Sequence, residues 1–431
     1  MAHAVNMTQS PPAAVSGKGL MTRARTMQLV GCAFLLVGAF LGWRGGDNFL
    51  MKAWMQGWLF AVTLSLGALF FITIQHMVRA GWSVVVRRPA EALAGNLQWL
   101  WLGFIPFVVL WLQGRLDVLF PWANLEHLAQ VDAAEAHTIA KKSAFLNVPF
   151  FMIRAAIYLT VWALLARFFV SNSAAQDNDG RIERTLRMAK WSGPALILFG
   201  LTTTFAAFDW IMSLNPLWFS TMFGVYFFAA CCAGGFSTIA LLCMRVQDQG
   251  YLKGVITAEH YQDLGKLLFG FGIVFWAYIA FSQYMLIWYG NIPEETTWFM
   301  ARQIGQWRLV SVALLFGHFI LPFLFLISRW TKRWRGTFLF GVVWMLVFHW
   351  VDLTYLIQPV IPHDLAQFAT YDEVQAAYAH EYAPIFNPVL LTFSFGFLLL
   401  TLGGALSRLT RTGLLCRNDP RLAESLRFEN Y

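Results

Sequence analysis

Long apolar runs recur along this chain and are separated by shorter polar segments. Ten of them approach or exceed the roughly 20 residues that an α-helix needs to cross a membrane. They are Thr26–Trp43, Ala53–Met77, Gly95–Gln113, Val148–Val170, Trp191–Leu214, Leu217–Met244, Lys266–Tyr289, Trp307–Ser328, Arg335–Gln358 and Pro388–Ser407. Strands of a membrane barrel would be shorter and would alternate between apolar and polar positions. The pattern therefore predicts an all-α integral membrane protein with ten transmembrane helices.

The seventh run carries an unusual number of polar groups. A charged segment, His260–Lys266, leads into it, and acidic residues follow its end. Within the run, Tyr278, Ser282 and Tyr289 recur at helical spacing, which places them on one face. We expect this stripe to face other helices and to form a wall between two helical bundles.

Composition agrees with a membrane protein and argues against a resident metal or redox cofactor. The chain is 58% hydrophobic and 13% charged, whereas a soluble domain carries about 25% charged residues. None of the five cysteines belongs to a C-x-x-C or C-x-x-C-H motif, so neither an iron–sulfur cluster nor a c-type haem is indicated. The sequence also lacks a P-loop, an H-E-x-x-H motif and a G-x-S-x-G motif. We therefore expect no catalytic residue, cofactor ligand or metal ligand in this chain.

The distribution of positive charge predicts the orientation. Most of the 31 Lys and Arg residues fall in the N-terminal segment, the even-numbered loops and the C-terminal segment, and such residues concentrate on the cytoplasmic side. Both termini are thus expected in the cytoplasm. The net charge of +8 favours anionic lipids as partners, and no basic domain outside the membrane suggests nucleic acid.

Two long loops are predicted on the outer side. They are Gly114–Asn147 and Pro359–Asn387, and the latter contains no Lys or Arg. Such loops suit either a docking surface for an external partner or a solvated cap, and both interpretations stay open.

A short internal sequence repeat predicts the arrangement of the helices. The segments Phe208–Trp210 (FDW) and Phe348–Trp350 (FHW) lie near the ends of the fifth and ninth runs. We predict two four-helix bundles, from spans two to five and six to nine, flanked by spans one and ten. Residues 1–25 would be a disordered cytoplasmic tail, residues 26–407 one membrane domain and residues 408–431 a cytoplasmic C-terminal tail.

Ionisable groups inside the runs are the candidate functional residues, because each costs at least ~2.5 kcal/mol to insert. One set would form a periplasmic half-channel: Arg154, Asp209, Tyr278, Gln283, His349 and Asp352. A second set would form a cytoplasmic half-channel: His76, His260, Asp263 and Lys266. His318 is a candidate bridge between the two sets. Buried histidines and carboxyl groups can exchange protons near neutral pH, as a relay requires.

A purely structural interpretation of the same residues is also available. Arg154 and Asp209 would form a salt bridge, because an arginine does not release its proton at ordinary pH. His349 and Asp352 would be hydrogen-bonded anchors between helices. His76, near a span end, would simply be solvated, as would His260.

Four blocks of the sequence resemble a known family. They are Gly57–Phe71, Val86–Leu93, Phe208–Phe228 and His260–Glu295, and they are similar to the polysulfide-reductase-like (NrfD-like) membrane subunits. Within that family the chain most resembles the ActF subunits of alternative complex III, a bacterial quinol:cytochrome c oxidoreductase. The resemblance covers roughly residues 26–407 and implies the two-bundle fold.

The resemblance also implies partners and a role. The chain would sit beside a homologous quinol-binding membrane subunit, with iron–sulfur and multihaem cytochrome c subunits on the periplasmic side. Quinol, iron–sulfur clusters and haem c would belong to those partners, and this chain would support quinol oxidation and conduct protons. Two alternatives are kept: a quinol-binding catalytic subunit that uses His349 and Asp352, and a stand-alone secondary transporter.

Overall fold

The computed structural model describes residues 18–43, 46–361, 368 and 370–430, and within these ranges its regular elements are all helices. Nine described helices are long and apolar enough to cross a membrane, or ten if one bent pair counts as a single span. The prediction of an all-α, multi-pass membrane protein is confirmed at this level. Most of the predicted tail at 1–25 lies outside the described residues, whereas residues 18–25 are helical.

The spans differ in regularity. Seven continuous helices are α1 (Lys18–Gly42), α2 (Asp47–Met77), α7 (Val148–Asp179), α8 (Ile182–Trp210), α9 (Phe223–Asp248), α16 (Arg335–Ile357) and α18 (Pro388–Thr412). The segmented ones are α3 (Val84–Ala94) with α4 (Ile105–Leu112); α10 (Ala258–Leu267), the π-helical η6 (Leu268–Phe275) and α11 (Trp276–Gly290); and α13 (Trp307–Leu314), the π-helical η7 (Leu315–Ile320) and α14 (Leu321–Leu326).

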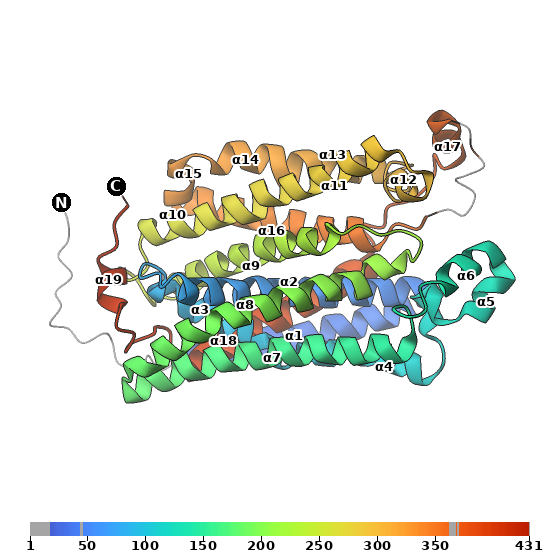
Figure 1. The fold of residues 1–431 in the computed structure, drawn as a ribbon. Helices are drawn as coiled ribbons and strands as arrows, with labels where there is room; N and C mark the ends of the chain where they lie inside the picture. The colour runs from blue at the N-terminus through green and yellow to red at the C-terminus, as the bar shows by residue number, and fades with distance from the viewer. Residues whose placement is uncertain (1–17, 44–45, 362–367, 369, 431) are drawn as a thin grey trace.

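Short helices mark the two ends of the molecule. They are α5 (Leu125–Val131), α6 (Ala133–Ala140), α12 (Pro293–Met300), α15 (Arg329–Arg333), α17 (Tyr371–Ala377) and α19 (Leu422–Leu426). Figure 1 shows the long helices side by side, with α19 at one end and α5, α6 and α17 at the other. We call these the α19 end and the α6 end.

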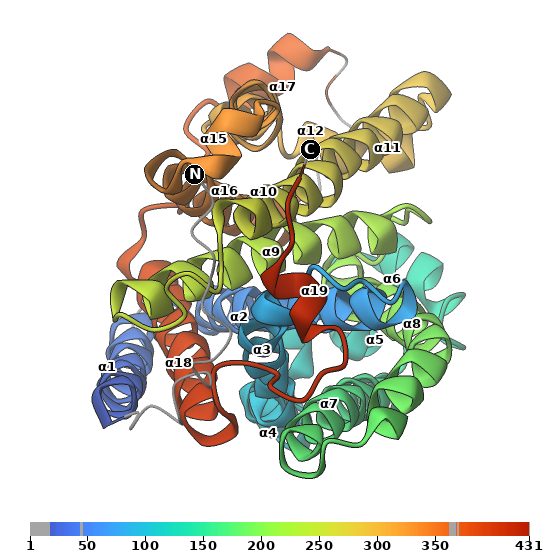
Figure 2. The same ribbon diagram turned by 90° about the vertical axis from the view of Figure 1, so that its left-hand side faces the viewer.

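Helices α2 and α9 form the centre of the molecule and are almost wholly buried. They cross where Gly67 faces Cys231 and Gly235, and a side chain on either glycine would overlap the backbone of the other helix. Close approach of two helices in a membrane depends on such small residues. Helices α8 and α16 contact both members of this pair, and α18 contacts α2 (Figure 2).

The third predicted run, Gly95–Gln113, is not a straight helix. A helical segment that begins at Val84 meets a second one, Leu100–Leu112, at a bend of 42°. Two indole N–H groups of α2 donate hydrogen bonds to backbone carbonyl groups at the bend. Trp58 Nε1 donates to Leu100 O at 2.7 Å, and Trp54 Nε1 donates to Gly103 O at 2.8 Å. Because side chains satisfy carbonyl groups that a straight helix would bond internally, the break is tolerated inside the bundle.

Helix ends differ from the apolar runs in both directions. Helix α7 continues to Asp179 and α8 begins at Ile182, so most of the predicted loop between the fourth and fifth runs is helical. Gly180, with φ 65°, makes the turn between them. Helix α1 likewise starts before the predicted residue 26, because Leu20 and Ala24 are buried in its packing with α18. A hydrophobicity pattern does not indicate these extensions, because they consist of polar helical turns beyond the apolar runs.

Candidate functional site

The first buried polar group is an ion pair between α7 and α8. Arg154 Nε and Nη2 donate to Asp209 Oδ2 and Oδ1 at 2.8 and 2.7 Å, and Tyr158 OH donates to Oδ2 at 2.7 Å. The rings of Phe145 and Phe150 lie 3.9 and 4.1 Å from the guanidinium carbon. Both carboxylate oxygens are therefore occupied by a planar, permanently charged partner. This geometry matches the structural interpretation of the pair.

Asp352 on α16 is the second buried carboxyl group, and its surroundings differ. It is wholly buried, it accepts from Tyr226 OH of α9, and it accepts from Trp276 Nε1 of α11 at 3.2 Å. Both partners are neutral, and Asp352 forms no ion pair with a described residue. A carboxyl group held by neutral donors can gain or lose a proton without breaking an ion pair.

Trp276 connects Asp352 to His318 at the junction of the two π-helical segments. The imidazole of His318 stacks on the indole, with ring centroids 3.9 Å apart and planes at 4°. His318 Nε2 lies 3.2 Å from Gly272 O, and Nδ1 forms no hydrogen bond of good geometry, although the backbone of Phe348 lies close to the ring. With Nε2 protonated and donating to the Gly272 carbonyl group, Nδ1 of the neutral ring is an acceptor. π-Helical turns are frequent at functional sites.

His349 repeats this arrangement one helix away. Its Nε2 lies 2.8 Å from Thr63 Oγ1, and that hydroxyl donates to Phe60 O at 2.9 Å. The hydroxyl hydrogen is thus used, so Nε2–H is the donor to Thr63, and Nδ1 is again an acceptor without a partner. A side chain at Gly234 would overlap the imidazole, so this glycine makes room for His349.

A ladder of amide and hydroxyl groups runs along the α2–α16 interface toward the α6 end. Gln56 Nε2 donates to Thr354 Oγ1 at 2.6 Å, and Gln358 Nε2 donates to Gln56 Oε1 at 2.9 Å. Gln358 and Lys52 also line a cleft of about 700 Å³ at the α6 end, which is the outer side in the predicted topology. Buried polar side chains therefore extend from this cleft toward the level of His349 and Thr63, which lie one to two turns deeper on the same helices.

A buried arginine fixes the outer end of α16. Arg302 is fully buried and donates to Tyr355 O at 2.9 Å, to Leu356 O at 3.1 Å and to Trp298 O at 2.9 Å. Cations near a helix C-terminus are favourable because the last carbonyl groups lack internal partners. Arg302 therefore places a positive charge at the end of the helix that carries Asp352.

The predicted polar wall on the seventh span is wrong. Tyr278 and Tyr289 are 63% and 87% exposed, because the buried face of α11 is formed by Trp276, Ile279, Gln283 and Ile287. Gln283 accepts from Ser220 Oγ at 3.2 Å. Tyr278 therefore does not join the other periplasmic candidates, and Gln283 has its own partner away from Asp352.

The two inner histidines are buried, so the expectation that they are solvated is wrong. His260 is fully buried; its Nδ1 accepts from Thr257 N at 3.1 Å and its Nε2 lies 3.0 Å from Ser425 O of the C-terminal segment. His76 is 3% exposed and stacks on Phe169. Tertiary packing by α7 and the C-terminal segment, rather than depth along the span, decides their burial.

The other inner candidates form a surface pair. Asp263 and Lys266 are 2.5 Å apart, and Lys266 Nζ also donates to Asn430 Oδ1 at 2.9 Å. His76 lines a different cleft from these two. The described hydrogen bonds do not join this set to His318, so the predicted cytoplasmic half-channel stays a prediction.

Sequence reasoning missed several contacts of the central group: Gln56, Thr63, Tyr226, Trp276 and Gln358. One signal was available, because Gln56 and Thr63 are polar positions two helical turns apart within an apolar run. The donors to Asp352 come from α9 and α11, and no pattern along one helix indicates which residue of another helix will face it.

Comparison with protein-family models and with curated proteins finds no match to this chain.

Proposed function

We propose that this chain is a membrane subunit of a bacterial quinol:cytochrome c oxidoreductase of the alternative complex III type and conducts protons through its second bundle. The observation that carries the proposal is the buried group around Asp352, in which a carboxyl group with only neutral partners lies among two histidines with unused acceptor nitrogens. Ionisable groups placed this way inside a membrane domain are typical of proton relays.

The packing of the helices supports the proposed two-bundle architecture with ten spans. Counting the bent pair α3–α4 as one span gives ten. Helix α2 contacts α3, α7 and α8, while α9 contacts η6 and α16, and η7 contacts η6 and α16. Helices α1 and α18 pack as a pair beside α2, and α2 and α9 join the two sets. An even number of spans would put both termini on one side. The basic α15 and the start of α8 lie at the α19 end, which favours the cytoplasm for that end.

Each residue of the central group has a defined part in the proposed path. Gln56, Thr354 and Gln358 would lead protons inward from the outer cleft. Asp352 would hold the exchangeable proton, and Tyr226 would follow its charge by rotating its hydroxyl. The unpartnered nitrogens of His318 and His349 would accept protons from water that enters the bundle.

In this proposal quinol is oxidised in a homologous sister subunit, and iron–sulfur clusters and haem c reside in periplasmic partners. The exposed outer helices α5 and α6 and the outer loop with α17 offer contacts for such partners. The Arg154–Asp209 pair would keep the first bundle rigid while protons move in the second.

The test uses the intact complex in liposomes. Asp352→Asn keeps the shape of the side chain but removes the exchangeable proton, so the number of protons moved per electron should fall while the subunits still co-purify. Asp372→Asn, on the exposed outer helix α17, is the matched control and should change neither. An unchanged ratio in Asp352→Asn contradicts the relay. A chain that is stable and active as a transporter without partners contradicts the subunit assignment.

A second candidate, quinol binding by this chain, is favoured by the outer cleft. Its wall combines amide and cationic groups with apolar ones: Asn48, Lys52, Gln358, Phe49 and Trp307. Small-molecule sites commonly combine an apolar wall with a few polar groups. Photolabelling by an azidoquinone that is lost in Gln358→Leu but kept in Asp352→Asn would select this candidate.

A further inference from the structure

A cleft at the α19 end has the chemistry of a phosphate-binding site. It has a volume of about 300 Å³ and lies between the end of α2, the starts of α3 and α8, and the segment before α19. Its ionisable lining residues are three arginines, one histidine and one aspartate: Arg79, Arg87, Arg421, His76 and Asp419. Guanidinium groups match the oxygens of a phosphate in charge and geometry.

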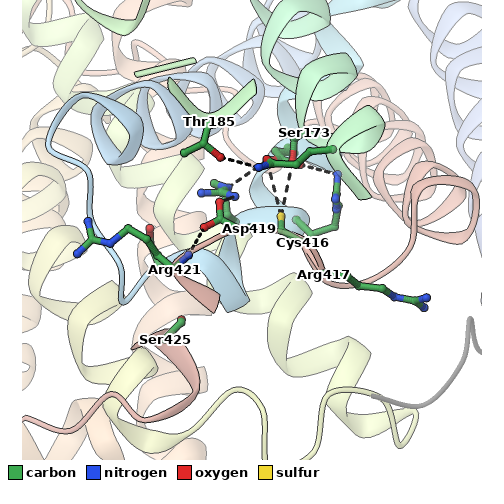
Figure 3. Close-up of polar contacts among 12 residues, drawn as sticks. Ser173, Thr185, Cys416, Arg417, Asp419, Arg421 and Ser425 are labelled. Atoms are coloured by element: carbon green, nitrogen blue, oxygen red, sulfur yellow. Dashed lines mark hydrogen bonds and ion pairs between the residues drawn. The ribbon is translucent and has the colours of Figure 1, made fainter. Parts of the chain in front are cut away.

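An ion-pair network lies beside the cleft, and Figure 3 shows the polar contacts around Asp419 and Cys416. Arg87 lies 2.5 Å from Asp419 and 3.3 Å from Glu91, and Arg88 lies 2.9 Å from Glu91. Burial raises the pKa of the Cys416 thiol, so the thiol is neutral. This network holds the C-terminal segment against α3 and thereby fixes one wall of the cleft.

Arg421 of the cleft is paired with Glu424, whereas two buried polar groups and one exposed arginine of the cleft have no partner among the described residues. His76 Nε2 and Gln75 Oε1 form no hydrogen bond, although these side chains are only 3% and 5% exposed. The Arg79 side chain is exposed and forms no ion pair with a described residue. Buried polar groups are normally satisfied. A phosphate would accept from His76 and Arg79, whereas Gln75 Oε1 is itself an acceptor and would need a donor such as the Arg79 guanidinium group.

Arg79 stands where a glycine is normally preferred. It has φ 50°, and it closes α2 with the bonds Arg79 N→His76 O at 3.3 Å and Ala80 N→Gln75 O at 2.9 Å. This is the helix-ending motif whose left-handed position favours glycine. A guanidinium group is therefore present at the cleft despite an unfavourable backbone conformation.

One edge of the cleft is apolar. Ile182 and Leu186 of α8 line it and are each 55% exposed on the lateral surface. A soluble phosphate does not need such an edge, whereas the acyl chains of a lipid do. We propose that this cleft binds the phosphate head group of an anionic phospholipid, with its chains against α8. The site is separate from the Asp352 group and does not depend on the function proposed above.

The test measures lipid retention by the full chain with native mass spectrometry after delipidation. Phosphatidylglycerol is the probe, phosphatidylcholine the neutral-lipid comparison and inorganic phosphate the soluble competitor. Arg79→Gly should bind phosphatidylglycerol about fivefold more weakly, the worth of one arginine at an anionic surface. It should fold at least as stably as the natural chain, because glycine suits the left-handed position.

The matched control is Arg23→Ala in another cleft of about 360 Å³ at the same end. There Asp248 pairs with both Arg245 and Arg335, and no described lining residue has a buried polar atom without a partner. Arg23→Ala should retain phosphatidylglycerol as the natural chain does. Unchanged retention in Arg79→Gly, an equal loss in Arg23→Ala, or displacement of the lipid by inorganic phosphate would each overturn the proposal.

Discussion

Two carboxyl groups are buried at similar depth in this protein, Asp209 in α8 and Asp352 in α16, and their partners are opposite in kind. Asp209 receives two N–H groups from Arg154 and a hydroxyl from Tyr158. Asp352 receives only a hydroxyl from Tyr226 and an indole N–H from Trp276. Asp209 is the middle residue of the FDW segment, whereas His349 holds that position in FHW and Asp352 follows three residues later. The neighbouring helices give the two acids different chemistry.

The comparison teaches that burial alone does not mark a proton carrier. An arginine fixes a carboxylate in its charged form and in one geometry. Neutral donors leave both protonation states accessible. We therefore assign a structural part to Asp209 and propose the relay only for Asp352.

Removal of the arginine should have the largest effect. Arg154→Met leaves Asp209 buried without its charged partner, which is expected to cost about 3–5 kcal/mol of unfolding free energy. Unfolding in mixed micelles with increasing denaturing detergent measures this loss. The double variant Arg154→Met, Asp209→Leu should regain most of it, because no uncompensated charge remains. A double variant as unstable as the single one would contradict this account.

The two Asp→Asn variants should lose different amounts of unfolding free energy. Asp209→Asn leaves the buried Arg154 without its counter-charge and should cost about 3–5 kcal/mol, while Asp352→Asn should cost about 1 kcal/mol or less. The same unfolding measurement compares them directly. Equal losses would show that Asp352 also has a charged partner in the folded protein.

Loss of the tyrosine hydroxyl is expected to have a moderate effect. Tyr226→Phe removes one donor to Asp352 without changing the ring packing and should cost about 1 kcal/mol. It should also slow proton movement in liposomes, because the hydroxyl no longer follows the charge of Asp352. Tyr261→Phe, whose hydroxyl donates to Gln247 elsewhere on α9, is the control and should leave proton movement unchanged.

The smallest effect is expected on α2. Thr63→Val removes the partner of His349 Nε2 and should cost about 0.5–1 kcal/mol. Thr73→Val on the same helix is the control, because Thr73 donates only to Leu69 O of its own helix. A larger loss at Thr73 than at Thr63 would contradict the assigned link between α2 and α16.

Much of the fold could be predicted from hydrophobicity. Each of the ten apolar runs corresponds to a helix or to a bent or segmented helical span. The bend at Leu100 could not be predicted, because it depends on indole donors from α2. The start of α1 at Lys18 depends on packing with α18.

The candidate site was predictable only in part. Pairing of Arg154 with Asp209 followed from the high energy of a lone buried charge. The exposed position of Tyr278 could not be predicted, because helical spacing shows which residues share a face but not which face is buried. His260 was expected in solvent, and the C-terminal segment buries it.

The sequence by itself determined the class of this protein. It also determined which buried residues need a polar partner inside the membrane, because the energy of inserting a polar group depends mainly on the group itself. Only the tertiary structure decided which partner each acquired. Contacts among α9, α11 and α16 leave Asp352 with neutral donors, and the contact between α7 and α8 gives Asp209 an arginine.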